Sequence, residues 1–246
     1  MIKAVFFDLD DTLYDQLQPF LMAIQTAGIG GLFSDRLQIE DLYKRLRRHS
    51  DRLWERHVSG LMSLEELRFE RTAAAFLDIG INISEQTALQ LQQNYEREQK
   101  QIALREGVEP LFEQLEACGI RIGLITNGPV EHQMIKIRAL GLLNWMDEQA
   151  IYISDGIGIA KPDPEVFHHV RLQTCCEPER LVYVGDAWHN DIVPSYRAGW
   201  NSIWLNGRLQ QPRAEESDVE YMECRTINEI MPLIPSSGKS ETGCLL

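Results

Sequence analysis

Basic residues are in short supply in this 246-residue sequence: 24 Lys and Arg stand against 37 Asp and Glu, which gives a formal net charge of −13. Nucleic-acid backbones and anionic membranes bind positively charged protein surfaces, so we expect neither as a partner. The deficit does not exclude phosphate itself, because a metal ion and a few converging basic groups can bind phosphate locally.

Cysteine is also scarce, and we expect neither a cleaved leader nor a membrane segment. The five cysteines include no C-x-x-C pair, so neither a disulfide framework nor a zinc site is indicated. No basic segment followed by a cleavable apolar one precedes residue 3. Residues 16–34 lack charge, but their glutamines, proline and glycines favour a buried helix and a turn over a membrane span. We therefore expect a cytoplasmic protein with reduced thiols.

Carboxylates are concentrated directly after the first apolar run. Residues 3–7 read as a buried strand, and Asp8, Asp10 and Asp11 follow within four positions. Because unpaired buried carboxylates are costly, such a cluster at a strand end favours a cation and contact with solvent. A calcium loop of the EF-hand type is excluded, since Leu13 and Pro19 stand where Gly and Glu would be required. An acidic turn remains the alternative for this stretch taken alone.

The rest of the chain predicts an α/β fold interrupted by a helical insertion. Residues 16–103 repeat apolar residues at helical spacing, which predicts a small helical bundle. Beyond residue 107, predicted strands and helices alternate, which is typical of a mainly parallel, doubly wound sheet. The predicted strands are 120–125, 150–154, 181–185 and 202–205, and the predicted helices are 108–118, 130–140, 164–171 (with Asp163 as its N-cap) and 192–198. We expect a core of 1–15 and 104–231, a helical domain of 16–103, and a flexible tail of 232–246.

Polar residues stand at or just beyond the carboxyl end of most of these strands. In a parallel sheet these ends share one edge, so the side chains should converge. They are Asp8 with Asp10, Thr126 with Asn127, Lys161, and Asp186 with Asp191. Each pattern alone would be an ordinary turn or a surface residue; together, in chain order, they predict a catalytic site.

These residue types suit phosphoryl transfer. Asp8 can attack phosphorus as a nucleophile, and Asp10 can protonate the leaving oxygen and then activate water. Asp8 and Asp186 are the predicted side-chain ligands of a Mg²⁺ ion, which removes the repulsion between carboxylate and phosphate.

Positive charge and hydrogen-bond donors complete the predicted site. Thr126, Asn127 and Lys161 are predicted to bind the phosphoryl oxygens. Asp191 is predicted to orient either metal-bound water or Lys161. Asp11 is interpreted as a turn or solvent-facing residue.

The motifs resemble those of the haloacid dehalogenase superfamily of phosphohydrolases. Its four motifs match Asp8-Leu-Asp10-Asp-Thr12, Ile125-Thr-Asn127, Lys161-Pro-Asp-Pro, and Gly185-Asp186 to Asn190-Asp191. The resemblance implies a Rossmann-like core with an α-helical cap inserted after the first motif. It also implies magnesium-dependent hydrolysis through an aspartyl-phosphate on Asp8, with Asp10 binding the metal through its backbone carbonyl. Dehalogenases of the superfamily lack the acid at the position of Asp10, so its presence favours a phosphatase.

A finer resemblance concerns the substrate. Leu53-Trp54, Gly60, Ser63 and Arg68-Phe69, with Ile125–Gly128 and Ile203–Asn206, are similar to the pyrimidine 5′-nucleotidase branch. This implies a small phosphorylated metabolite, a nucleoside monophosphate, as substrate. The alternatives are a sugar-phosphate or phosphoglycolate phosphatase, a phosphomutase, and a non-catalytic phosphate-binding regulator that kept the fold.

Overall fold

The computed structural model describes residues 1–235 of the chain and divides it into two compact units. One unit contains Met1–Asp15 together with the chain from Ala103 onward, and the other is Gln16–Ile102. The second unit is thus inserted in the chain between the first strand and the remainder of the first unit. The C-terminal residues 236–246, including Cys244 and most of the expected tail, lie outside the described residues.

The first unit is built on a six-stranded parallel sheet in the order β3-β2-β1-β4-β5-β6. The strands are β1 (Ala4–Phe7), β2 (Arg121–Thr126), β3 (Ile151–Ile153), β4 (Leu181–Gly185), β5 (Asn201–Leu205) and β6 (Met222–Cys224). The predicted parallel, doubly wound α/β fold is confirmed. Because β1 pairs with both β2 and β4, it lies at the centre of the sheet, between the two halves where the strand order reverses.

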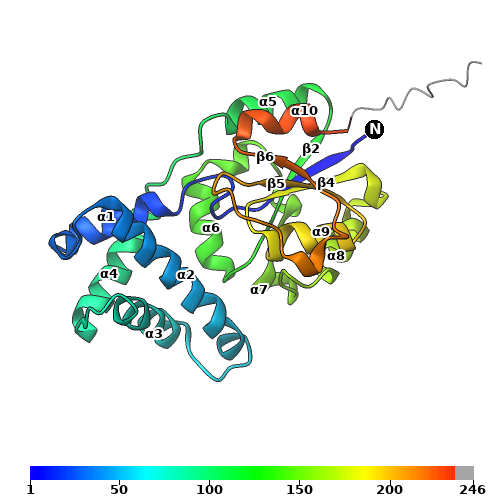
Figure 1. The fold of residues 1–246 in the computed structure, drawn as a ribbon. Coiled ribbons are helices and arrows are strands. Elements are labelled where there is room, and N and C mark those ends of the chain that lie inside the picture. The colour runs from blue at the N-terminus through cyan, green and yellow to red at the C-terminus, as the bar shows by residue number, and fades with distance from the viewer. Residues whose placement is uncertain (236–246) are drawn as a thin grey trace, which may run out of the picture. The chain divides into compact units, whose positions relative to one another are not determined.

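Helices cover both faces of this sheet because its central strand is apolar on both sides. All four residues of β1 are buried, and successive side chains point to opposite faces. Phe6 packs on one face in a cluster with Phe167 of helix α8 (Glu165–Thr174). Phe7 packs on the other face against Phe112 of helix α5 (Val108–Ala117). Figure 1 shows α5 and α8 on opposite sides of the sheet.

Three of the remaining helices of this unit, α6 (Val130–Ala139), α7 (Ser154–Ile157) and α9 (Val193–Arg197), lie in connections between strands. Helix α10 (Ile230–Leu233) follows β6. Short 3-10 turns lie at Leu142–Asn144, Glu148–Ala150, Pro178–Arg180, Ala214–Glu216 and Ile227–Glu229. A π-helical turn, Trp188–Ile192, precedes α9.

The inserted unit is helical, with its own apolar core. Its helices are α1 (Leu17–Thr26), α2 (Arg36–Val58), α3 (Leu64–Leu77) and α4 (Glu85–Glu98), with a 3-10 turn at Gly30–Leu32. Phe20, Leu42, Phe76 and Leu91, one from each α-helix, meet in this core. Ser63 and Glu66 form the capping box that starts α3. Among residues 1–235, no helix combines the length and apolarity needed to cross a membrane.

The structure differs from the sequence predictions mainly near the C-terminus. The sequence does not predict strand β6, because three residues at a sheet edge carry too little apolar pattern. Helix α10 continues beyond residue 231, and Ile234 is buried, so the segment 232–234 is not the flexible tail that its composition suggests. Helix α8 begins at Glu165 rather than Pro164 and ends at Thr174 rather than Arg171.

Candidate active site

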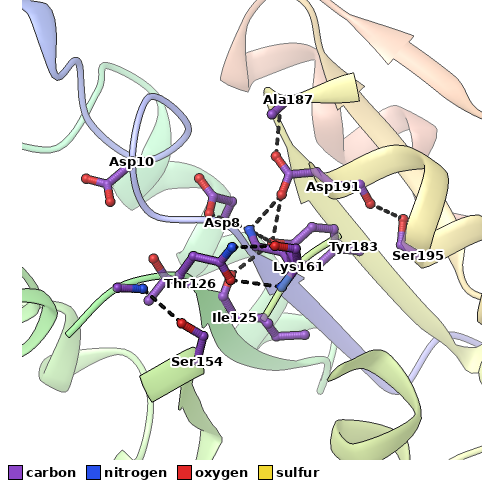
Figure 2. A network of polar contacts seen from close by, with 12 residues as sticks. Asp8, Asp10, Ile125, Thr126, Ser154, Lys161, Tyr183, Ala187, Asp191 and Ser195 are labelled. Carbon is purple, nitrogen blue, oxygen red and sulfur yellow. Dashed lines mark hydrogen bonds and ion pairs between the residues drawn. The ribbon is translucent and has the colours of Figure 1, made fainter. Parts of the chain in front are cut away.

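The predicted polar residues meet at the carboxyl edge of the three central strands. Asp8 follows the end of β1, Thr126 is the last residue of β2, and Asp186 follows the end of β4. These strands are neighbours and parallel, so their ends lie side by side. Figure 2 shows Asp8, Thr126, Lys161 and Asp191 around one small region of space.

Lys161 lies at the centre of this site and is almost completely buried. Its Nζ donates to Asp8 Oδ1 at 2.7 Å, to Asp191 Oδ1 at 2.6 Å and to the hydroxyl oxygen of Tyr183 at 2.7 Å. The Tyr183 hydroxyl in turn donates to the carbonyl of Ile125 at 2.9 Å. All three protons of the ammonium group are therefore used, and its position is fixed by strands β1, β2 and β4 (Figure 2).

Asn127 determines where the loop carrying Lys161 lies. Its Nδ2 donates to the carbonyl of Lys161 at 2.7 Å, and its Oδ1 accepts from the Lys161 amide at 3.0 Å. The side chain predicted to bind phosphate is thus bonded on both sides to the backbone of Lys161. Neighbouring Thr126 is 1% exposed, and its hydroxyl accepts a hydrogen bond from Gln133 at 2.8 Å.

Three carboxylates form an acidic group beside Lys161. One oxygen from each of Asp8, Asp186 and Asp191 lies within 4.8 Å of the others. Asp191 belongs to the π-helical turn, and its Oδ2 accepts from the amide of Ala187 at 2.9 Å. Gly185 is required for this approach, because a Cβ there would overlap the carboxylate of Asp191. Lys161 and the more distant Arg208, which Asp186 shares with Asp11, leave this group with surplus negative charge. Oxygen ligands are those that Mg²⁺ prefers, so the residues fit a divalent cation.

The electrostatics of the group support the same conclusion. Burial raises the pKa of Asp8 from 3.8 to about 7. The negative charges of Asp191 and Asp10 act in the same direction, and the positive charge of Lys161 acts against them. Burial and the nearby Asp11 raise the pKa of Asp186 well above its usual value. Two ionised carboxylates with oxygens 4.8 Å apart repel each other by about 3.5 kcal/mol at an effective dielectric of about 20, and a bound cation would offset this repulsion.

The side chain of Asp10 lies outside this acidic group. Its carboxylate accepts from Lys136 Nζ at 2.5 and 2.7 Å, from the Tyr14 hydroxyl at 2.5 Å, and from Gln133 Nε2 at 3.0 Å. Figure 2 shows the Asp10 carboxylate apart from Asp8. The metal contact predicted for Asp10 is through its backbone carbonyl, and that contact stays a prediction.

Asp11 is not the solvent-facing residue that the sequence suggests. It takes the left-handed conformation of a turn, with φ of 66°, but its side chain is 4% exposed. Its Oδ2 lies 2.9 Å from Nη2 of Arg208, whose Nη1 is 3.9 Å from Asp186 Oδ2. Asp11 therefore links the first turn to the loop after β5.

Sequence reasoning did not identify four polar residues in and around the site: Tyr183, Gln133, Lys136 and Arg208. Tyr183 reads as a core residue of a buried strand, and Arg208 as a loop residue. Gln133 and Lys136 are three residues apart on one face of α6, alongside the buried Ile137. That spacing is visible in the sequence, but polar residues at such spacing usually form a solvated helix face.

The fold and the site together define a Rossmann-like α/β protein with an acidic, lysine-bearing site at the carboxyl edge of its sheet. A family model for haloacid dehalogenase-like hydrolases matches residues 2–198, so the chain belongs to this hydrolase family. Its structure is similar to that of the putative HAD-hydrolase YfnB of Bacillus subtilis, with a TM-score of 0.71 and 23% identity over 94% of this chain and 98% of the other. That likeness concerns the fold.

Sequence relatives of the chain include enzymes named as phosphatases. The glyceraldehyde 3-phosphate phosphatase of Methanothermobacter thermautotrophicus is 26% identical over 235 residues, covering 95% of this chain and 98% of the relative. The pyrimidine 5′-nucleotidase YjjG of Escherichia coli is 34% identical over 93 residues, covering 37% of this chain and 40% of the relative. Phosphatase chemistry is thus supported, whereas the nucleotidase resemblance holds for only part of the chain.

Proposed function

We propose that the protein is a magnesium-dependent phosphomonoesterase that forms an aspartyl-phosphate on Asp8 and acts on short sugar phosphates. The observation that carries the proposal is the convergence of Asp8, Asp186 and Asp191 around the buried ammonium group of Lys161. This arrangement joins a nucleophilic carboxylate to fixed positive charge and a set of oxygen ligands for a cation.

The proposed reaction has two steps. In the first, the Asp8 carboxylate attacks phosphorus, the bond from phosphorus to the ester oxygen breaks, and Asp10 gives its proton to that leaving oxygen. In the second, water attacks the aspartyl-phosphate, loses a proton to Asp10, and releases phosphate from Asp8. Lys161 and the Thr126 hydroxyl are proposed to bind the phosphoryl oxygens, and Asn127 and Asp191 to hold Lys161 in place.

Asp8 and Asp186 would hold Mg²⁺ with their side chains, and Asp10 with its carbonyl. The ion would supply positive charge against the phosphoryl oxygens and the carboxylates. We propose that the inserted helical unit is the cap that selects the substrate.

Mg²⁺ should stabilise the folded protein as well as support activity. Ligand at a hundred times its Kd stabilises by about 2.7 kcal/mol, so the melting temperature should rise with Mg²⁺ and fall back with EDTA. Asp186→Asn should weaken the apparent Mg²⁺ affinity at least about tenfold. Differential scanning fluorimetry across a Mg²⁺ titration measures both effects. Asp147→Asn, an exposed carboxylate before β3, is the matched control; an equal Mg²⁺ response in wild type and Asp186→Asn would refute this site.

The proposed substrate class follows from how much of the chain each relative matches. A specificity-determining helical unit should be shared with relatives of the same substrate class. The match to the glyceraldehyde 3-phosphate phosphatase covers nearly the whole chain, and that to the nucleotidase little more than a third. A sugar-phosphate substrate is therefore better supported than the nucleoside monophosphate that the finer sequence resemblance implies.

A substrate panel tests the proposal directly. With Mg²⁺ present, kcat/KM for D-glyceraldehyde 3-phosphate should exceed that for uridine monophosphate by at least about tenfold, a difference of about 1.4 kcal/mol in transition-state binding. Phosphoglycolate and p-nitrophenyl phosphate complete the panel, and phosphate release is the measurement. A higher kcat/KM for uridine monophosphate would restore the nucleotidase hypothesis.

Two further outcomes of this panel would point to a protein that is not a phosphatase. Phosphate binding without turnover in fully metallated protein would favour a phosphate-binding regulator. Transfer of phosphate between sugar hydroxyls without release would reveal a phosphomutase.

A further inference from the structure

Helix α6 carries two buried polar residues on the face turned toward the site. Gln133 is 2% exposed and Lys136 is 3% exposed, and they lie one turn apart. Burying an ammonium group without a partner costs several kcal/mol, so a lysine in this position needs a specific counter-charge. Its counter-charge is the proposed acid–base residue, Asp10.

The carboxylate of Asp10 is held from several directions. Lys136 Nζ contacts both of its oxygens, at 2.5 and 2.7 Å. The Tyr14 hydroxyl donates to Oδ1 at 2.5 Å, and Gln133 Nε2 donates to Oδ2 at 3.0 Å. A carboxylate with this many donors has one preferred orientation, because any rotation would break charge-assisted hydrogen bonds.

Gln133 also connects Asp10 to the proposed phosphate-binding residues. The same Nε2 lies 2.8 Å from Thr126 Oγ1 and 2.5 Å from the carbonyl oxygen of Asn127, so its two protons are shared among three acceptors. The side chain is packed tightly under the following turn, since a Cβ on Gly128 would lie 3.1 Å from Nε2. The position of Asp10 is thereby tied to the end of β2.

We propose that Lys136 is a positioning residue that, with Gln133, sets the orientation in which Asp10 exchanges a proton with the leaving oxygen and with water. The inference rests on the proposed function and extends it to helix α6, whose residues belong to none of the four family motifs. Proton transfer depends steeply on the placement of the donor, so loss of Lys136 acts on the proton step and spares attack by Asp8.

The leaving group distinguishes positioning from a merely structural role. An alkyl phosphate such as glyceraldehyde 3-phosphate needs a proton on its departing oxygen, whereas p-nitrophenolate departs without one. Lys136→Met is expected to lower kcat/KM, which reports the steps up to departure of the leaving group, by about 10²-fold for the alkyl ester and by about threefold or less for p-nitrophenyl phosphate. Arg138→Met removes an exposed cation from the same helix and should change neither rate.

A double-mutant cycle gives a second readout. In an Asp10→Asn background, Lys136→Met should cause little further loss on the alkyl ester, because the two residues act as one unit. Gln133→Leu and Tyr14→Phe should shift the alkyl-to-aryl rate ratio in the same direction, and they carry the test if Lys136→Met fails to fold.

Each outcome decides the inference. An equal loss on both esters in the folded variants, or additive losses in the cycle, would overturn the role of Lys136 and leave the proposed function intact. Failure of the wild-type enzyme to hydrolyse either ester in Mg²⁺ would overturn the proposed function, and this inference with it.

Discussion

Asp8→Asn should reduce kcat by at least about 10⁴-fold, because a covalent mechanism without its nucleophile retains only binding and electrostatic stabilisation. The substitution preserves the shape of the side chain, so the packing at the end of β1 should be retained. Steady-state phosphate release with glyceraldehyde 3-phosphate measures the effect. Asp147→Asn, an exposed carboxylate of the same unit, should keep wild-type activity.

The same variant should not lose stability in metal-free solution. The folded state raises the pKa of Asp8 from 3.8 to about 7, so folded protein binds this proton more tightly than unfolded protein does. The ionised carboxylate therefore opposes folding once the pH exceeds the unfolded-state value, and this effect is complete above about pH 7. Urea denaturation in EDTA at pH 8 should show Asp8→Asn to be at least as stable as wild type.

Substantial remaining phosphatase activity in Asp8→Asn would exclude the covalent mechanism.

Lys161→Met should remove both activity and stability. Its side chain is 3% exposed and lies between Asp8 and Asp191, so the substitution leaves two buried carboxylates without their cation. Breaking a buried ion pair from one side costs about 3–5 kcal/mol, and loss of a charge that stabilises the transition state costs about 10²- to 10³-fold in kcat.

The contrast between the two variants is the informative measurement. Asp8→Asn removes one carboxylate from a crowded acidic group, whereas Lys161→Met removes the cation that the group shares. Urea midpoints should therefore fall for Lys161→Met alone. Lys3→Met, an exposed lysine at the opposite edge of the sheet, is the control for loss of positive charge. A wild-type midpoint for Lys161→Met would show that the buried network does not stabilise the fold.

Local sequence patterns predicted which polar residues lie at the strand ends, because each strand end is recognisable from a few neighbouring residues. An apolar run ending in a polar residue marks the end of β1 at Asp8, and the same pattern marks Thr126 and Asp186. The rule that alternating strands and helices make a parallel sheet then brings these ends to one edge. Convergence of distant residues was thus predictable without any knowledge of side-chain contacts.

Side-chain partners could not be predicted in this way. Three carboxylates follow β1, and the sequence alone suggests no partner for the third, Asp11. Its partner is Arg208, which lies 197 positions further along the chain. Asp191, rather than the side chain of Asp10, completes the acidic group, because a π-helical turn directs it toward Asp8.

The sequence by itself determined the class of fold and the positions at which polar groups end the strands, since both depend on local apolar patterns. Only the tertiary structure decided which of those groups face one another and which helix face turns inward. Lys136 illustrates the reason: a lysine on an amphipathic helix is exposed or buried according to the partner that packing supplies. Here that partner is Asp10, 126 residues away in the chain, and no local pattern records the pairing.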